Sequence, residues 1–336
     1  MTQLPVLDIS DFRADPTSPA ARDFVDQLRA ICHEVSFFYV TGHGVPEKLD
    51  QEIAVQARAF FGLPLSERLA IQNIHSPQFR GYTCNGGEYT AGQQDRREQL
   101  DIGPEDPEPV LTADSPPWMR LRGPNLWPAS LPDFRPAVEQ WLHSIDELGT
   151  TLVHGLAAAL GQPLDFFDPI VDPHPDFRLK IINYPATVDP ASRQGVGEHR
   201  DTGFMSIILQ DDVGGLQVHR AGQFVDVPRL PGTYVVNLGE MLQLLTSGYF
   251  HASIHRVVSP PAGSDRLSIA YFHNPALHAT LTPVPLPPEL AAQAPGGESV
   301  DPSNPIFANF GMNTLKVRLR SHPDVAALHH TDLVVQ

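Results

Sequence analysis

Residues 197–218 read GEHRDTGFMSIILQDDVGGLQV, and this stretch is the most informative one in the chain. It places His199 and Asp201 two residues apart, directly before the apolar run FMSIIL (204–209). Side chains two residues apart on a β-strand point to the same face, so a strand here would present both groups together. A histidine beside a carboxylate is part of the ligand set of transition-metal sites that keep open positions. The stretch therefore indicates a candidate metal site in a β-rich region.

The His-x-Asp spacing alone is weak evidence, because it occurs four times. The triplets are His174/Asp176, His199/Asp201, His322/Asp324 and His330/Asp332. With 15 histidines in the chain, about one such triplet is expected by chance. Pro follows His174 and His322, which fits a central strand poorly, and His330 lies near the end of the sequence, where order is least expected. Only the triplet at His199 is followed at a suitable distance by further candidate ligands.

Two later segments complete the candidate site. His255 begins the β-like run HRVVSP (255–260), and Arg266 and Ser268 begin the run RLSIAYFHNP (266–275). Two histidines and one carboxylate are a ligand set of non-haem iron, and they leave positions for a co-substrate and oxygen. A guanidinium and a hydroxyl on one strand face can bind a carboxylate. Taken alone, Arg266 could instead form an ordinary surface ion pair, but the ordered set is far more specific than any member.

The chain after residue 176 predicts a β-sheet core. Short β-like runs separated by turn residues are typical of an antiparallel sandwich or barrel rather than of βαβ units. The runs are Leu179–Tyr184, Phe204–Leu209, Leu216–Val218, Tyr234–Leu238, His255–Val258 and Leu267–Phe272. A jelly roll would close most of its edges and leave an open mouth for a site.

Helices are expected outside this core. Ser18 is a suitable N-cap for a first helix, a second is predicted from about residue 46 to 62, and a long support helix covers 132–160. Residues 75–130 are rich in Gly and Pro and have little periodicity, so we expect an irregular segment there, either a functional loop or a mobile linker.

Composition and charge narrow the classes of protein. The chain has 336 residues, 41% of them hydrophobic, which is enough to bury a sizeable core. It has 23 Lys and Arg against 39 Asp and Glu, a formal charge of −16, which argues against nucleic acid and anionic membranes as partners. Cys32 and Cys84 are too few for a disulfide framework or a thiolate zinc site. Because MTQLPVLDIS does not resemble a signal peptide, we expect a cytoplasmic protein.

The segments 197–218, 255–260 and 266–275 resemble, in order and spacing, the isopenicillin N synthase-like family of non-haem iron(II), 2-oxoglutarate-dependent dioxygenases. PVLD at 5–8 and FFYVTGHGVP at 37–46 are similar to the family's N-terminal part, so the resemblance covers nearly the whole chain. It implies a mixed α+β fold with an all-β core, in which a double-stranded β-helix (a cupin-like jelly roll) is flanked by helices.

The resemblance also implies the organisation of the chain and the roles of the site residues. The expected segments are an N-terminal region with substrate-side loops (1–130), a support helix (131–170), the β-helix core (171–285) and a C-terminal segment that packs on the core (286–336). The expected iron(II) ligands are His199, Asp201 and His255, and the expected contacts of the 2-oxoglutarate C5 carboxylate are Arg266 and Ser268.

A further co-substrate contact is open to two interpretations. NYP at 183–185 is similar to the family strand whose tyrosine helps to hold 2-oxoglutarate, which makes Tyr184 a candidate. It could equally be a core aromatic residue with a satisfied hydroxyl. Family members often have Asn where this chain has Ile182, so the contact at the other end of the co-substrate stays open.

The loop RGYTCNGGEYTAGQQD (80–95) and RSHPD (320–324) look similar to the bacterial branch that includes ethylene-forming enzyme. In that branch the corresponding loop and Arg line the substrate pocket. By this analogy, with one residue of the core strand added, the expected substrate contacts are Tyr82, Glu88, Thr90, Arg320 and Phe272. Each could instead be an ordinary loop, strand or surface residue.

The implied reaction is the oxidation, most simply hydroxylation, of an unactivated C–H bond of a small metabolite, with release of succinate and CO2. Iron(II), 2-oxoglutarate and O2 are the implied cofactors and co-substrates, and ascorbate is an expected stimulant. Three alternatives stay open: an oxidase of the isopenicillin N synthase type without 2-oxoglutarate, an ethylene-forming-type oxidase, and a catalytically inactive binding protein on the same fold. A small-molecule substrate, no nucleic-acid or membrane partner, and a monomer are expected.

Overall fold

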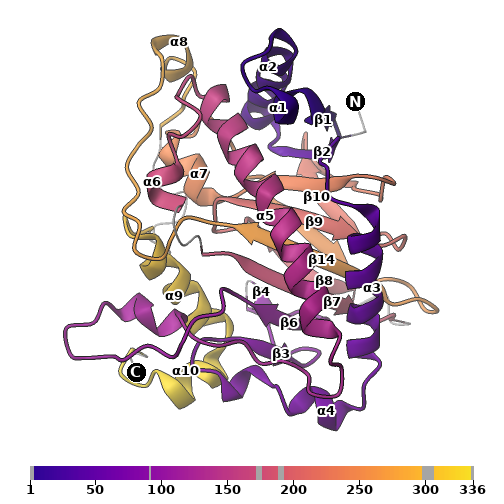
Figure 1. Cartoon of the computed structure of the whole chain (residues 1–336). Coiled ribbons are helices and arrows are strands. Elements are labelled where there is room, and N and C mark those ends of the chain that lie inside the picture. The colour runs from indigo at the N-terminus through magenta and orange to yellow at the C-terminus, as the bar shows by residue number, and fades with distance from the viewer. Residues whose placement is uncertain (1–3, 91, 172–175, 188–192, 297–305, 334–336) are drawn as a thin grey trace.

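Two β-sheets form the centre of the computed structural model, which describes residues 4–90, 92–171, 176–187, 193–296 and 306–333 (Figure 1). The larger sheet contains, in spatial order, β1 (Val6–Asp8), β2 (Phe37–Thr41), β12 (Tyr234–Leu238), β9 (Met205–Gln210), β14 (Arg266–His273), β7 (Arg178–Tyr184), β6 (Glu98–Ile102) and β3 (Gly81–Thr83). The smaller sheet contains β11 (Gln223–Asp226), β10 (Leu216–Arg220), β13 (His255–Val258) and β8 (Gln194–His199). A separate two-stranded ribbon pairs β4 (Tyr89–Thr90) with β5 (Gln93–Gln94).

The strand pairs of both sheets are antiparallel, apart from the parallel pair β1–β2. The strand order shows that strands from the first 130 residues share the larger sheet with strands from 171–285. The helices are α1 (Ser10–Ala14), α2 (Pro19–Glu34), α3 (Glu47–Phe61), α4 (Leu65–Leu69), α5 (Phe134–Ala159), α6 (Asp168–Val171), α7 (Glu240–Leu245), α8 (Pro288–Ala291), α9 (Phe310–Ser321) and α10 (Pro323–His329). Two 3₁₀ turns are η1 (Asn73–His75) and η2 (Pro117–Leu121).

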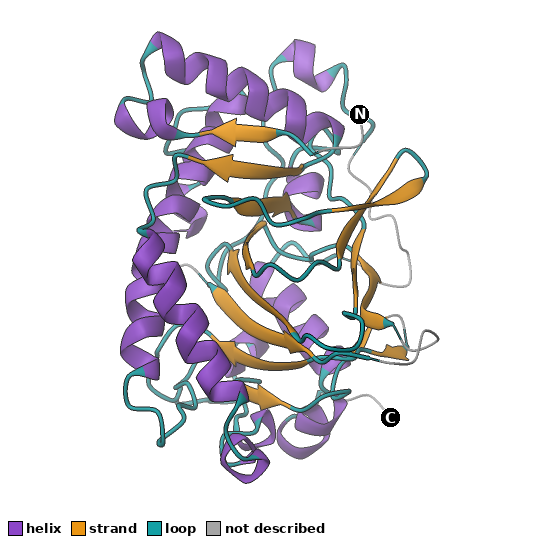
Figure 2. Ribbon diagram, turned by 90° about the vertical axis from the view of Figure 1, so that its right-hand side faces the viewer, coloured by secondary structure: helices purple, strands orange, loops and turns teal. Residues whose placement is uncertain are grey.

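The side chains of the larger sheet point alternately to its two faces, and each face borders a hydrophobic layer. On one face, Ile269 and Tyr271 of β14 pack with Trp141 of α5, and helices cover this side of the strands (Figure 2). On the other face, Ile182 of β7 packs in a second cluster with Val257 of β13 and other residues of the smaller sheet. The space between the sheets is thus bounded by alternate residues of each strand, as expected for a jelly roll.

The predicted fold class is confirmed, and the six predicted β-runs correspond to β7, β9, β10, β12, β13 and β14. The predicted helices are present as α2, α3 and α5. The Ser18 hydroxyl accepts a hydrogen bond from the Ala21 N–H (3.1 Å) at the start of α2. Just past the end of α5, Gly161 adopts a φ of +72°, which ends the helix without strain.

The prediction that residues 75–130 form an irregular loop is wrong in part. β3 and β6 lie in this segment and extend the larger sheet beside β7. Glu98, Gln99 and Asp101 of β6 read as loop residues because they are polar, yet all three are buried. The carboxylates of Glu98 and Asp101 are paired with cations from distant segments, which local sequence does not reveal.

β8 is not among the predicted strands, because it contains two glycines, which are depleted in strands. A Cβ atom on Gly195 would meet Tyr184 Cδ1 at 2.9 Å and Val257 O at 3.0 Å, so the close approach of these strands requires glycine.

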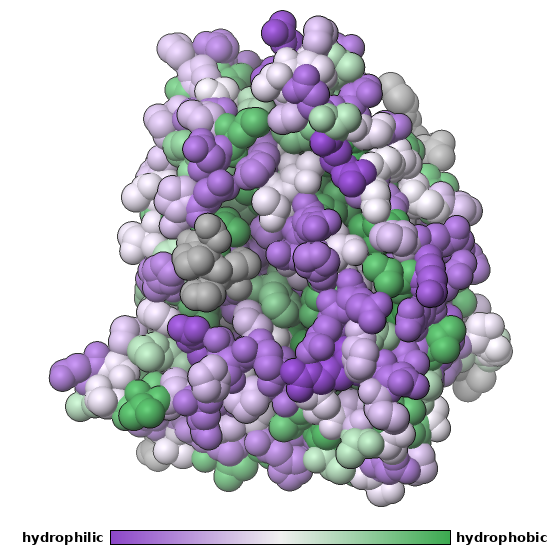
Figure 3. All heavy atoms as spheres, viewed as in Figure 1, coloured by the Kyte–Doolittle hydropathy of each residue, from purple (hydrophilic) through white to green (hydrophobic). Residues whose placement is uncertain are grey.

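Within the described residues, no helix is both long and apolar enough to cross a membrane. On the face shown in Figure 3, hydrophilic residues dominate and apolar ones are scattered between them.

Candidate metal and co-substrate centre

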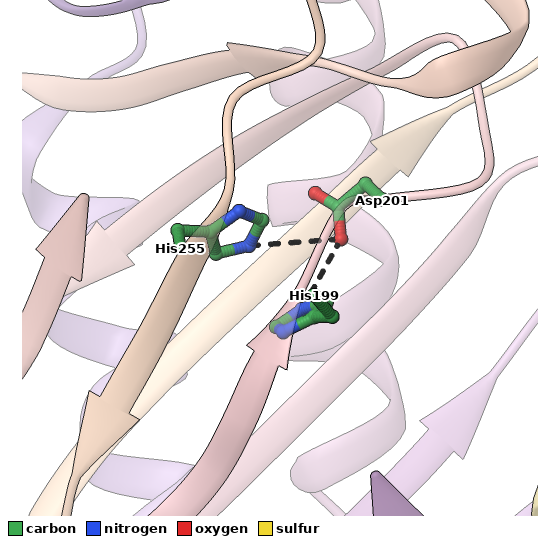
Figure 4. A group of neighbouring side chains, drawn as sticks. All are labelled: His199, Asp201 and His255. Atoms are coloured by element: carbon green, nitrogen blue, oxygen red, sulfur yellow. Dashed lines mark ion pairs between the residues drawn. The ribbon is translucent and has the colours of Figure 1, made fainter. Parts of the chain in front are cut away.

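Three side chains converge between the two sheets. His199 is the last residue of β8, Asp201 lies two residues beyond it, and His255 begins β13 as the pairing partner of His199. Asp201 Oδ1 lies 3.6 Å from His199 Nε2 and 3.8 Å from His255 Nε2 (Figure 4). In the described residues, this is the one group of three or more His, Cys, Asp or Glu residues placed to hold a metal ion. Asp201 lies past the strand end rather than on the strand, but the side chains still meet.

Hydrogen bonds behind these residues aim the ligand atoms inward. His199 Nδ1 lies 2.8 Å from the Gly197 carbonyl oxygen, and His255 Nδ1 lies 3.1 Å from the Ser253 carbonyl oxygen. A carbonyl only accepts, so each Nδ1 carries the proton and each Nε2 lone pair faces the centre.

The Asp201 carboxylate is oriented in the same way. Asn237 Nδ2 donates to Asp201 Oδ2 (2.7 Å), which leaves Oδ1 toward the two histidines. Behind it, Asn237 accepts a short hydrogen bond from the Ser206 hydroxyl. The orientation of the carboxylate is therefore set by a chain of buried polar groups.

The protonation states suit a divalent cation. Burial tends to raise the pKa of Asp201, but His255, His199 and Asn237 hold it well below its usual range. Burial, with a contribution from His199, lowers the pKa of His255 to about 4. A charged carboxylate and neutral imidazoles are the forms that bind metal, so the residues present fit an iron(II) ion.

A tight crossing of backbone fixes the loop that carries Asp201. The Glu240 N–H donates to the Asp201 carbonyl oxygen (2.7 Å), and the Gly239 N–H donates to Phe204 O (2.9 Å). A Cβ atom on Gly239 would lie 2.1 Å from Gly203 O, so only glycine permits this approach.

A buried arginine with free donors lies on β14. Arg266 is 1% exposed, and its Nη2 donates to Gln210 Oε1 (3.1 Å), whereas Nε and Nη1 have no partner among the described residues. Its guanidinium carbon lies 5.0 Å from the centroid of the Tyr184 ring. Ser268 follows on the same face. An unpaired buried guanidinium is costly, so these donors indicate a place for an anionic ligand.

One cavity of about 750 Å³ is lined by the three candidate metal ligands and also by Arg266, Ser268 and Tyr184. Of the expected substrate contacts, Glu88, Thr90, Phe272 and Arg320 also line it, but Tyr82 does not. The Tyr82 hydroxyl instead donates to Glu98 (2.6 Å) on the far side of β6. The structure therefore brings together ten of the eleven residues singled out in the sequence.

The floor of the cavity contains an ionic network that sequence reasoning missed. Glu88 contacts Arg97, Lys180 Nζ (3.2 Å) and His322 Nε2 (3.0 Å). Burial opposes the charged form, yet the charges of Arg97 and Lys180, with the hydrogen bond to His322, hold the pKa of Glu88 well below its usual range. The alternation of Lys180 with Ile182 and Tyr184 on β7 was the available signal, because it places a cation on the same face.

A second buried pair continues this network. Arg318 Nη2 donates to Asp101 Oδ1 (2.8 Å), and Lys180 Nζ lies 3.6 Å from the same oxygen. Arg318 comes from α9, so the C-terminal segment closes one wall of the cavity. No local pattern in the sequence links α9 to β6.

Two family profiles match the chain. One is described as the N-terminal part of non-haem dioxygenase in morphine synthesis and matches residues 4–130. The other is the 2OG-Fe(II) oxygenase superfamily, which matches residues 175–275 and so covers the candidate centre.

Individual relatives agree with the profiles. The chain is 36% identical to the 2-oxoglutarate-dependent dioxygenase frbJ of Dothideomycetidae sp. (strain 11243), an alignment that covers 96% of this chain and 90% of the relative. It is 30% identical to homoarginine-6-hydroxylase 2-ODD-233 of Oryza sativa subsp. japonica, over 84% of this chain and 88% of the relative.

Solved structures show the same fold. A 2OG-Fe(II) oxygenase family protein from Caulobacter crescentus matches with a TM-score of 0.74 at 26% identity, covering 95% of this chain and 99% of the other. A full-length Neurospora crassa protein, solved with alpha-KG and 5-formyluracil, matches with a TM-score of 0.76 at 24% identity over 95% and 96%.

Proposed function

This chain belongs to the 2OG-Fe(II) oxygenase superfamily and is a 2-oxoglutarate-dependent dioxygenase, and we propose that His199, Asp201 and His255 hold its iron(II). Iron(II), 2-oxoglutarate and O2 are its cofactor and co-substrates. The observation that carries the residue assignment is the convergence of two Nε2 atoms and one carboxylate oxygen, each oriented from behind by its own hydrogen bond.

We also assign the co-substrate contacts. Arg266, with two unpartnered donors in the same cavity, binds the C5 carboxylate of 2-oxoglutarate, and Ser268 adds a hydrogen bond from the same strand face. Tyr184 packs against the Arg266 guanidinium and limits its freedom. A charge-assisted, fork-shaped contact of this kind fixes the orientation of the bound diacid as well as its affinity.

The residues of this chain contribute positioning and exclusion of water, while the bound iron(II) supplies the activation of O2 that oxidises the substrate and converts 2-oxoglutarate to succinate and CO2. Glu88, Thr90, Phe272 and Arg320 face the same cavity and form part of the substrate wall. Tyr82 supports that wall from behind through Glu98. Hydroxylation of a C–H bond is the outcome that we propose.

We also propose where the chain lies within the superfamily. The motif order supports the isopenicillin N synthase-like group, while the likeness to the bacterial ethylene-forming branch rests only on the 80–95 loop and Arg320. Relatives from a fungus and from rice give that branch no support. We propose a small-molecule substrate, a monomeric protein and the segment division 1–130, 131–170, 171–285 and 286–336.

Succinate release tests this assignment. Protein loaded anaerobically with iron(II) receives O2 and 2-oxoglutarate with a panel of small metabolites, including homoarginine, the substrate named for one relative. We expect succinate formation that depends on a panel compound, that is lost in His199→Ala, and that persists in the control His143→Ala, whose side chain is exposed. Succinate formation that survives in His199→Ala would contradict the ligand assignment.

The same assay separates the alternative reactions. Oxidation of a panel compound without 2-oxoglutarate would indicate an oxidase of the isopenicillin N synthase type, and ethylene among the products would indicate the ethylene-forming type. Failure of the wild-type protein to bind iron(II) would indicate an inactive binding protein.

A further inference from the structure

The cavity is rich in cations although the chain is strongly acidic. Seven of its lining residues are Lys or Arg, in a chain with a formal charge of −16. They are Arg97, Arg178, Lys180, Arg200, Arg266, Arg318 and Arg320. A cation that is removed from water needs an anion beside it. A lining cation that has no anionic partner within the protein therefore indicates where an anionic ligand binds.

Three of these cations have carboxylate partners within the protein. Arg97 and Lys180 both contact Glu88, and Arg318 contacts Asp101. These contacts are buried and leave no free charge on the floor of the cavity. Ligand binding is therefore not needed to satisfy them.

Two more cations lie toward solvent. Arg200 Nε donates to the Ala252 carbonyl oxygen (2.9 Å), and Arg320 is exposed. Burial raises the pKa of Glu240, and the charges of Arg200 and Arg320 act against that rise, so these groups compensate one another. Arg266 is assigned to 2-oxoglutarate, which leaves one cation to explain.

That cation is Arg178. It forms no hydrogen bond and no ion pair with any described residue, although it is half-buried on the cavity face of β7. Burial and the neighbouring positive charge of Arg318 lower the pKa of Arg178 to about 10. Asp176 attracts it electrostatically but does not form an ion pair with it. No described residue occupies the guanidinium fork, which leaves it able to bind a ligand.

Arg178 and Arg266 lie at opposite ends of the cavity. β7 pairs with β14 so that Tyr184 is opposite Arg266 and Arg178 is opposite Phe272. The six steps along β7 from Arg178 to Tyr184 span about 20 Å at the usual rise of a strand. A five-carbon diacid held at Arg266 is far too short to reach Arg178 as well.

We propose that Arg178 binds a carboxylate of the substrate to be oxidised, and hence that the enzyme acts on a small carboxylic acid. The proposal rests on the proposed function, because it assumes that Arg266 holds 2-oxoglutarate. A single guanidinium matches the two oxygens of a carboxylate in a bidentate contact. Phe272, opposite Arg178 in the sheet, offers apolar packing for the carbon skeleton.

Arginine modification by phenylglyoxal, followed by peptide mapping, tests the proposal on full-length protein loaded with Mn(II). The probes are benzoate and hexanoate, and the controls of matched shape are benzamide and hexanamide. We expect Arg178 to react faster than the ion-paired Arg318. We expect each carboxylate to protect Arg178 at about tenfold lower concentration than its amide, since a hydrogen bond to a charged partner contributes that much. Equal protection by acid and amide, or slower reaction of Arg178 than of Arg318, would overturn the proposal.

Addition of 2-oxoglutarate separates this proposal from the one on which it rests. With Mn(II) present, 2-oxoglutarate should protect Arg266 and leave Arg178 reactive. Protection of Arg178 by 2-oxoglutarate would assign it to the co-substrate and overturn the proposal. Failure to protect Arg266 would instead contradict the co-substrate site, while the acid–amide pairs still decide the role of Arg178.

Substituted proteins provide a second readout, the rise in thermal unfolding midpoint on adding each probe, because a ligand stabilises the state that binds it. Arg178→Gln should lose the difference between benzoate and benzamide, and Arg178→Lys should retain part of it. The control Arg229→Gln, which removes a surface ion pair with Asp212, should retain all of it. A full acid–amide difference in Arg178→Gln would contradict the proposal.

Discussion

The buried arginines on the two sides of the cavity differ in their partners. On the floor, Arg97 and Arg318 are matched by carboxylates of the protein. At the other side, Arg266 is also buried, but it forms no ion pair with a described residue, and its Nε and Nη1 have no hydrogen-bond partner among those residues. Burial alone therefore does not distinguish a binding residue from a supporting one. The difference lies in ion pairing, because Arg97 Nε also lacks a hydrogen-bond partner among the described residues. A guanidinium that is paired with a carboxylate of the protein supports the wall, and one without such a carboxylate marks where an anionic ligand belongs.

We expect the largest effect of any substitution at the metal ligands. His199→Ala should lower iron(II) affinity by more than about 100-fold, since loss of a residue behind a ligand already costs 10- to 100-fold. Anaerobic equilibrium dialysis against iron(II) measures this, with His143→Ala as the control. Unchanged affinity in His199→Ala would contradict the assignment.

The next largest effect concerns the floor and should appear in stability. Glu88→Gln leaves Arg97 and Lys180 without their shared carboxylate, and breaking a buried pair costs about 3–5 kcal/mol. Urea unfolding should show a fall of this size in the free energy of unfolding. Glu139→Gln, which breaks an exposed pair with Arg135, should change it by less than about 1 kcal/mol. Equal effects would remove the distinction between floor and surface.

Arg266→Gln should show the opposite pattern. We expect the KM for 2-oxoglutarate to rise by about 30-fold or more, because truncating one partner of a buried charged contact costs about 2–5 kcal/mol. The free energy of unfolding without ligand should not fall, because the change removes an uncompensated buried charge. Steady-state kinetics and urea unfolding measure the two quantities. A loss of stability with an unchanged KM would make Arg266 a structural residue.

Asn237→Ala tests the support behind the metal site. Loss of its hydrogen bond to Asp201 Oδ2 frees the carboxylate to rotate, and we expect iron(II) affinity to fall by about 10- to 100-fold. The decrease should be smaller than for His199→Ala in the same dialysis experiment. An affinity equal to that of the wild type would show that the carboxylate is held in place by other contacts.

The smallest expected effect is on the free energy of unfolding at acidic pH. Burial opposes ionisation of Asp101, but Lys180 and Arg318 lower its pKa from 3.8 to about 2. A pKa depressed by folding contributes stability that is present above the unfolded value and is lost as the pH falls through the folded value. Unfolding free energy should therefore drop between about pH 4 and pH 2, and the drop should be shallower in Asp101→Asn. An identical slope in both proteins would contradict this.

Much of the fold and centre could be predicted because the signals are local. The runs around His199, His255 and Arg266 each combine strand-like residues with chemical groups at fixed spacing, and these motifs come together in the structure. Tyr82 is different: its place in the loop suggested the cavity, but its hydroxyl contacts Glu98 behind the wall.

The floor could not be predicted because its contacts are long-range. Asp101 on β6 can be a buried strand residue because Lys180 and Arg318, both distant in sequence, compensate its charge. A polar run such as EQLDI reads as a loop unless its partners are known. The lack of an anionic partner for Arg178 among the described residues could not be predicted for the same reason, since only the assembled structure shows which cations have a carboxylate beside them.

An anomalous-diffraction map from crystals grown with Mn(II) and 2-oxoglutarate would locate both the metal ion and the co-substrate in the cavity. We expect one metal peak bound by His199 Nε2, Asp201 Oδ1 and His255 Nε2, with the distal carboxylate of 2-oxoglutarate on the Arg266 guanidinium. A metal bound elsewhere, or a co-substrate carboxylate on the floor cations with Arg266 still unpaired, would contradict this expectation.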